Sequence, residues 1–451
     1  MVVVIPWGKT MPQSKMSVTQ LTLLTTLNML GSGIIMLPAK IASVGGIGLL
    51  SWGIVCVSAV AMAYAFAYCG MYSKHTAGLG SIAENAFGDF GCFLTNVSYA
   101  LALLLANIAI TISTVTYLFA VFDIPLSSQV MPITTVVMLW LATLINLPGS
   151  RFTGRISAIT VWGIFIPMVV LLCALPFYFS QSIFEANWNP LQLNDVFSFK
   201  TAVPMMFWSF LGLESAFANS DSVENPEKSV PTAVLIATVV TAVLYIAVST
   251  LIVGALPNAT LVSATAPFCI IFNTIFTPTV SKVLALLMFL ALFGSLMGWQ
   301  FTMSQVFKIS ADHGHLPSIF NQGMVRNIPA VGLLIITFFQ TFGILAAPIM
   351  DDIFLHFENI VEFSTLLNVL PYLTCMAAAF TIVRSTPTDP VHDFSVRIAA
   401  GISLAFLVGY FAIINNDLMK FMTLFLLFSL ATYGVLVAKR NPNLIPKHQD
   451  S

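Results

Sequence analysis

Charged residues are what this sequence has least of. Only 8% of its 451 residues are Asp, Glu, Lys or Arg, whereas 58% are hydrophobic. A water-soluble domain does not need so much apolar surface, so the composition indicates a protein that crosses a membrane many times. The formal net charge of −1 provides no basic field that would attract nucleic acid, so we expect none as a partner.

Several motifs of enzyme and motor chemistry are also missing. The six cysteines form no CxxC pair, and the chain contains neither GxxxxGK[ST] nor HExxH. We therefore expect no enzymatic activity and no cofactor. His313 and His315 in "DHGH" have an HxH spacing, but the sequence shows no second group of ligands beside them. We predict no metal site.

Long apolar runs take the place of these motifs. Twelve of them approach the length of about 20 residues that a membrane-spanning helix needs. An even number of spans puts both ends of the chain on one side, and all but four of the 17 lysines and arginines then share that side. This bias predicts that both termini are cytoplasmic. The predicted spans are 18–43, 46–70, 94–121, 130–148, 156–179, 199–220, 232–256, 278–307, 329–348, 359–383, 395–414 and 418–438.

Two of the predicted spans contain residues that interrupt helices. The first span has Gly31-Ser32-Gly33 followed by Pro38, and the sixth has Gly212 close to Glu214. Interrupted helices at matching positions of two halves indicate the central site of a transporter. Small residues also let helices pack closely, which is the alternative reading. We favour the site because the two breaks lie five spans apart and one of them is beside a buried acid. Unwinding around Gly212 would let Trp208 and Glu214 face one cavity.

Glu214 is an acidic residue in the middle of an apolar span. Such a residue is costly to bury without a partner, and no lysine, arginine or histidine lies deep in any predicted span. The missing partner is therefore a cationic substrate or a proton. In the alternative reading, Glu214 stays protonated and forms a hydrogen bond with a neighbouring helix.

Aromatic and polar side chains add to this picture. Indole faces attract ammonium groups and cover methylene chains, so Trp208 and Trp299 suit an alkyl amine. Tyr99 and Asn107 are further polar residues in an apolar span. Asn107 is equally suited to a hydrogen bond between helices.

Five stretches of the chain carry a family resemblance. They resemble the basic amino acid/polyamine antiporters of the amino acid–polyamine–organocation superfamily, and most of all its putrescine–ornithine exchangers, over roughly residues 14–440. The resemblance implies an all-α integral membrane protein with 12 transmembrane helices in one domain. It also implies a LeuT-like 5+5 inverted repeat (16–180 and 199–384) with discontinuous helices 1 and 6, and helices 11 and 12 appended at 395–438. The five stretches are "NMLGSGIIMLPAKIASVGG", "ANIAITIS", "WSFLGLESAFANSDSVENPEKSVPTAVL", "GSLMGWQFTMSQVFK" and "NVLPYL".

The same resemblance implies roles for particular residues. It places the α-amino acid end of the substrate at Gly31-Ser32-Gly33, where backbone N–H groups at the start of a half-helix would suit a carboxylate. The residues implied to bind substrate are Glu214, Trp208, Trp299, Gly31, Ser32, Gly33, Tyr99, Asn107 and Ser364. Those implied to take part in gating or transport are Cys69, Glu84, Tyr372 and Lys308; on its own, Glu84 reads as a solvated loop charge.

The resemblance also implies a function. We expect a secondary transporter of the bacterial inner membrane that exchanges putrescine for ornithine, takes up polyamine with protons, and assembles as a homodimer. Lysine–cadaverine exchange, arginine–agmatine exchange and one-way proton-coupled uptake remain alternatives. A channel or an amino-acid sensor on the same fold is a further alternative, which saturable and trans-stimulated flux would exclude.

Overall fold

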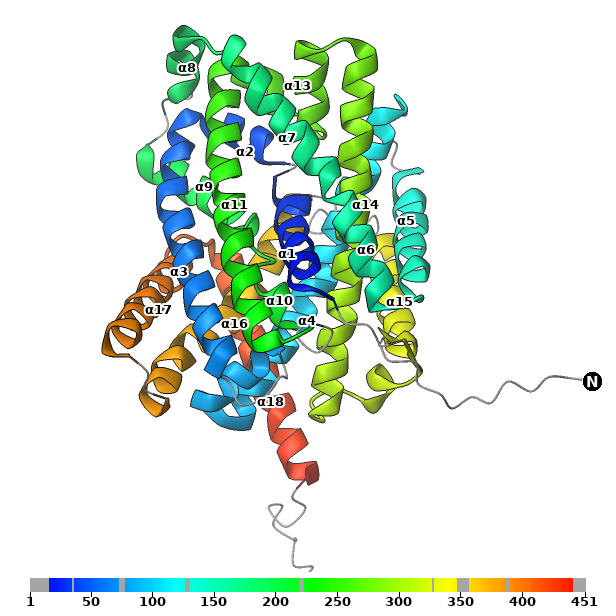
Figure 1. The fold of residues 1–451 in the computed structure, drawn as a ribbon, viewed down its shortest axis with the longest axis vertical. Helices are drawn as coiled ribbons and strands as arrows, with labels where there is room; N and C mark the ends of the chain where they lie inside the picture. The colour runs from blue at the N-terminus through cyan, green and yellow to red at the C-terminus, as the bar shows by residue number, and fades with distance from the viewer. Residues whose placement is uncertain are drawn as a thin grey trace, which may run out of the picture.

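The chain folds into a bundle of helices that run mostly along the long axis of the molecule (Figure 1). The computed structural model describes residues 16–34, 36–72, 78–125, 130–190, 192, 194–218, 223–326, 328–346, 357–386 and 389–440. Apart from three short 3-10 turns and one two-stranded hairpin, β1 (Met324–Val325) and β2 (Ile328–Pro329), the elements in these ranges are α-helices. The helices are α1 (Val18–Gly33), α2 (Leu37–Val44), α3 (Leu50–Tyr72), α4 (Gly78–Val121), α5 (Val130–Asn146), α6 (Ser150–Thr160), α7 (Trp162–Ala174), α8 (Gln181–Trp188), α9 (Asp195–Trp208), α10 (Ser215–Ala218), α11 (Pro226–Ala255), α12 (Asn258–Leu261), α13 (Pro267–Ile275), α14 (Pro278–Asp312), α15 (Ala330–Ala346), α16 (Phe357–Ser385), α17 (Pro390–Phe411) and α18 (Asn416–Arg440).

The described helices account for the twelve predicted spans. Among the described residues, eight helical stretches are long and apolar enough to cross a membrane. Two further apolar helices, α5 and α15, have 17 residues each, and two interrupted segments, α1–α2 and α9–α10, make up the rest. The prediction of an all-α, multi-pass membrane protein is confirmed.

The start of the third predicted span differs most from the structure. The third span was expected over 94–121, but α4 begins at Gly78, and Gly88 bends it with a φ of 62°. Glu84, which reads as a loop charge in the sequence, therefore lies on helix. Hydropathy detects the part of a helix that crosses hydrocarbon, and it misses a helical segment with polar residues such as Glu84 and Asp89.

The first interruption lies between α1 and α2, in the middle of the bundle (Figure 1). Helix α1 ends at Gly33, and α2 begins at Leu37 with Pro38 in its first turn, where proline needs no N–H donor. The discontinuity of this span is confirmed. The expectation that Gly31-Ser32-Gly33 opens a half-helix is wrong, because Gly31 and Gly33 lie in the last turn of α1. The side chain of Ser32 lies outside what the structure describes.

The second interruption lies between α9 and α10. Helix α9 ends at Trp208 and α10 begins at Ser215; between them Gly212 has a φ of 125°, which only glycine adopts easily. The predicted unwinding around Gly212 is confirmed.

The two interruptions lie against each other. The hydroxyl of Ser209 donates a hydrogen bond to the carbonyl of Gly33 (3.1 Å). An added Cβ on Gly33 would lie 2.5 Å from the Cα of Ser209, so only glycine allows this approach. Tyr245 of α11 contacts both interrupted segments, because its hydroxyl lies 2.8 Å from the carbonyl of Met29 and 2.9 Å from that of Ser209. Glycine therefore allows close packing at the same place where the two helices are interrupted.

Both ends of the described chain lie at one end of the bundle. Met16 pairs with Val223, just before α11 begins, and Arg440 bonds the carbonyl of His313, just after α14 ends (2.7 Å). Helix α11 begins and helix α14 ends at the same end of the bundle (Figure 1). This arrangement agrees with an even number of spans.

Candidate functional site

Glu214 is fully buried at the second interruption, and three donors hold its carboxylate. Oε1 accepts a hydrogen bond from the hydroxyl of Tyr99 (3.1 Å), and Oε2 accepts one from the backbone N–H of Gly212 (2.8 Å) and one from the hydroxyl of Tyr372. Among the residues that the structure describes, no lysine, arginine or histidine forms an ion pair with this carboxylate. The carboxylate is thus positioned by neutral groups, without a positive partner among the residues in these ranges.

The two tyrosines reach Glu214 from different helices. Tyr99 lies on α4, whereas Tyr372 lies on α16 directly after Pro371. The ring of Tyr372 packs edge-on against Phe66 and Phe207, with centroids 5.5 and 6.0 Å apart, which fixes the direction of its hydroxyl. The resemblance associated Tyr372 with transport, and the structure gives it a direct contact with the predicted acid.

Trp299 lies where α14 meets the end of α1. Its indole N–H donates to the carbonyl of Asn28 (3.2 Å). An added Cβ on Gly212 would lie 3.1 Å from this indole ring and 3.1 Å from the backbone of Asn28. An added Cβ on Gly31 would lie 2.2 Å from the hydroxyl of Ser295 on α14. Close packing therefore brings Gly31, Trp299 and the Glu214 segment together.

Asn28 and Ser295 belong to this site, and sequence reasoning did not select them. Both are fully buried, and within the described part of the chain neither amide atom of Asn28 nor the hydroxyl of Ser295 has a hydrogen-bond partner. The indole nitrogen of Trp208 is also buried and has no hydrogen-bond partner among these residues. Buried polar groups are nearly always paired, so a group of unpaired ones beside a buried acid indicates atoms that are available to the polar groups of a ligand. The available signal was the position of Asn28 three residues before Gly31.

Asn107 and Ser364 hold helices together in the structure. The amide of Asn107 on α4 donates to Gln300 of α14 (3.3 Å), and Gln300 donates to Gln340 of α15 (3.0 Å). Ser364 of α16 donates to the carbonyl of Ala102 on α4 (2.8 Å). For Asn107 the geometry favours the alternative reading, a hydrogen bond between helices.

The remaining predicted residues lie apart from the carboxylate of Glu214. Cys69 is buried in α3. Lys308, near the end of α14, pairs with Asp312 one turn later (2.7 Å). Glu84 lies near Cys92 and His313. Among the described residues, no hydrogen bond or ion pair links Cys69, Lys308 or Glu84 to Glu214.

Comparison with known proteins identifies the family of this chain. The family model described as amino acid permease matches residues 16–442. The chain belongs to the amino acid permease family. As an amino acid permease it is a membrane transporter by family, which is the reason to expect transport rather than catalysis.

Individual relatives show which transporters this chain is similar to. The chain is 44% identical over 377 residues to the putrescine transporter PotE of Escherichia coli K12, an alignment that covers 84% of this permease and 86% of PotE. The same values hold for PotE of Haemophilus influenzae. The cadaverine/lysine antiporter of Escherichia coli K12 is 28% identical over 352 residues, which cover 76% of this chain and 78% of that protein.

Proposed function

We propose that this permease is a secondary transporter that exchanges putrescine for ornithine. The observation that carries the proposal is the buried carboxylate of Glu214, which is held by three neutral donors and has no cation among the described residues. An intramembrane acid of this kind marks a substrate or ion path. The higher identity to putrescine transporters than to the cadaverine/lysine antiporter supports the four-carbon amine as substrate.

The two substrates share an ammonium group at the end of a short methylene chain. In the proposed complex this ammonium binds Glu214, whose orientation Tyr99 and Tyr372 maintain, and the indoles of Trp208 and Trp299 cover the methylenes. The ammonium group supplies the positive partner that the carboxylate lacks. Their attraction is strongest when the site is closed to water, because water no longer screens the two charges.

The other end of the substrate differs, and Asn28 suits both forms. Its amide N–H can donate to the carboxylate of ornithine, while its amide oxygen can accept from the second ammonium of putrescine. The hydroxyl of Ser295 is likewise a donor or an acceptor. Both groups lie beside the end of α1 at Gly31, without partners among the described residues. This arrangement explains how one site accepts two ligands of different charge.

Exchange follows from the cost of moving an empty site. Without a cation, reorientation carries the Glu214 carboxylate across low-dielectric surroundings uncompensated, so the empty carrier rarely returns. Protonation of Glu214 removes this cost and permits net uptake together with a proton. We also propose a location in the bacterial inner membrane with both termini cytoplasmic, as the positive-inside bias predicts, and a homodimeric assembly.

The test is uptake of labelled putrescine into proteoliposomes that are empty or preloaded with ornithine, lysine or arginine. Strong stimulation by ornithine alone is the expected result. Stimulation by lysine or arginine instead would identify one of the alternative exchangers. Equal uptake into empty vesicles that rises with an inward proton gradient would overturn exchange in favour of proton-coupled import, and tight binding without flux would indicate a sensor.

A further inference from the structure

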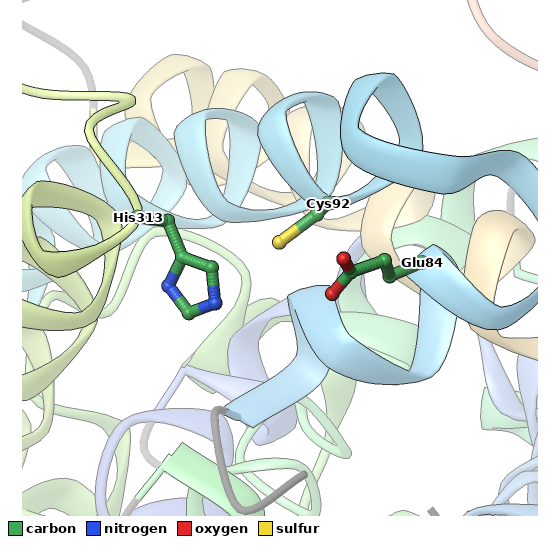
Figure 2. Close-up of side chains that lie close together, drawn as sticks. All are labelled: Glu84, Cys92 and His313. Atoms are coloured by element: carbon green, nitrogen blue, oxygen red, sulfur yellow. The ribbon is translucent and has the colours of Figure 1, made fainter. Parts of the chain in front are cut away.

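A second group of chemically reactive side chains lies at the end of the bundle where α14 ends. Glu84, Cys92 and His313 each direct one ligand atom toward a common space (Figure 2), and these atoms all lie within 4.8 Å of one another. Glu84 and Cys92 lie on opposite sides of the bend at Gly88 in α4, and His313 directly follows α14. Residues from three separate stretches thus converge outside the Glu214 site.

The imidazole of His313 is oriented as in a metal ligand. Its Nδ1 lies 2.9 Å from the carbonyl of Ile309, which can only accept a hydrogen bond, so Nδ1 carries the proton. In the neutral ring the lone pair is then on Nε2. Metal-binding histidines commonly donate their other N–H to a backbone carbonyl in this way, which fixes the ring and its tautomer.

The sulfur of Cys92 also has a supporting donor. The side-chain amide of Asn96, one turn further along α4, points an N–H at Sγ (3.5 Å). This contact orients the sulfur, which binds metal as the thiolate.

The acidic residue Asp89 lies close to these side chains and already has partners. Asp89 is occupied by Arg440 (2.9 Å) and by His315 (3.0 Å). His315 stacks on His313, with ring centroids 5.8 Å apart, so it adds to the wall of the site without being a ligand.

We propose that Glu84, Cys92 and His313 form a binding site for a zinc ion. One sulfur, one imidazole nitrogen and one carboxylate oxygen suit zinc, whereas calcium and magnesium prefer oxygen ligands alone. In a tetrahedral zinc site the ligand atoms are about 3.3–3.6 Å apart, so small side-chain rotations close the observed arrangement. Water takes the fourth position. The bound ion links both arms of the Gly88 bend to the end of α14.

The site can be tested with Co²⁺, which replaces Zn²⁺ and gives an absorption band for a cobalt–thiolate bond. The purified full-length protein in detergent should bind one Co²⁺ with this band, and Zn²⁺ should abolish it. Cys92→Ser should lack the band, and His313→Gln should bind Co²⁺ about 10-fold or more weakly. Cys173→Ser is the matched control, because Cys173 is an exposed thiol on α7 and should leave the band unchanged.

A second measurement guards against a misfolded variant. Zn²⁺ should raise the melting temperature of the wild type and of Cys173→Ser, but not that of Cys92→Ser or His313→Gln, because only a bound ligand stabilises the folded state by mass action. Absence of the cobalt–thiolate band in the wild type would overturn the proposal. Wild-type affinity in His313→Gln, or a band that persists in Cys92→Ser, would overturn it as well. None of these readouts depends on the proposed exchange activity.

Discussion

Asn28 and Gln300 are both fully buried amides in the middle of the bundle, yet their surroundings differ. Gln300 accepts from Asn107 and donates to Gln340, and its nitrogen also lies 3.4 Å from the hydroxyl of Thr143. Among the described residues, neither amide atom of Asn28 has a partner. Burial alone therefore does not distinguish a structural amide from a binding residue, but the presence or absence of partners does.

Glu214 extends this contrast to charge. The amides around Gln300 bond one another and join α4, α14 and α15, and of the amide atoms of Asn107, Gln300 and Gln340 only the oxygen of Asn107 lacks a partner among the described residues. Within the described part of the chain, the region around Glu214 contains a carboxylate without a cation and groups without partners on Asn28 and Ser295. Substitutions around Gln300 should therefore lower stability more than transport, whereas substitutions around Glu214 should lower transport more than stability.

The largest effect is expected from Glu214→Gln. The substitution removes the only buried charge proposed to pair with the substrate, and loss of one partner of a buried ion pair costs about 3–5 kcal/mol, or about 100-fold or more in exchange rate at low substrate. Counterflow of labelled putrescine measures it. Glu185→Gln, at an exposed position of α8, is the control and should exchange normally. Normal exchange by Glu214→Gln would refute the central role of this acid.

Asn28→Leu should separate transport from stability. The substituted residue no longer bonds the distal end of either substrate, which costs about 1.5–3 kcal/mol for a charged partner and weakens binding of putrescine and ornithine by about 10–100-fold. Thermal stability without substrate should not fall, because an unpaired buried amide is replaced by an apolar group of similar size. A destabilised protein with unchanged affinity would place Asn28 with the structural amides.

Tyr372→Phe and Tyr99→Phe should have a smaller effect on transport. Each removes one of three hydrogen bonds to the carboxylate of Glu214, so we expect the KM for putrescine to rise about 10-fold, equivalent to about 1.4 kcal/mol. Tyr410→Phe is a matched control: Tyr410 is also a buried tyrosine, and its hydroxyl has no partner among the described residues. Equal effects of all three substitutions would show that loss of a buried hydroxyl in itself, and not of its hydrogen bond to Glu214, weakens transport.

Gln300→Leu should have the smallest effect on transport and the opposite effect on stability. It leaves the buried amides of Asn107 and Gln340 without one partner each, which costs about 1–3 kcal/mol of unfolding free energy. The ratio of putrescine to cadaverine uptake should stay within about threefold of the wild-type ratio, because Gln300 is not proposed to contact the substrate. Loss of a substrate contact would change binding by more than this. Thermal unfolding in detergent and competition uptake measure the two quantities. A large change in that ratio would assign the amide network to the substrate path.

Much of the fold could be predicted because its signals are local. Long apolar runs require helices in a bilayer, and Gly212 and Pro38 mark where two of these helices stop or start. The start of α4 could not be predicted from hydropathy, because the residues before Gly88 form a helix without an apolar run. The exact position of the first interruption was also misplaced, since glycine at 31 and 33 is compatible with the last turn of a helix.

The sequence by itself determined that the chain is a multi-pass membrane protein, that its first and sixth spans are broken, and that Glu214 is the buried acid of its centre. Only the tertiary structure decided which groups surround that acid. Tyr99, Tyr372 and Asn28 are far apart along the chain, and hydrogen-bond geometry depends on how α1, α4 and α16 pack. The convergence of Cys92 and His313 has the same cause: each residue type is visible in the sequence, but the distance between two helices is not.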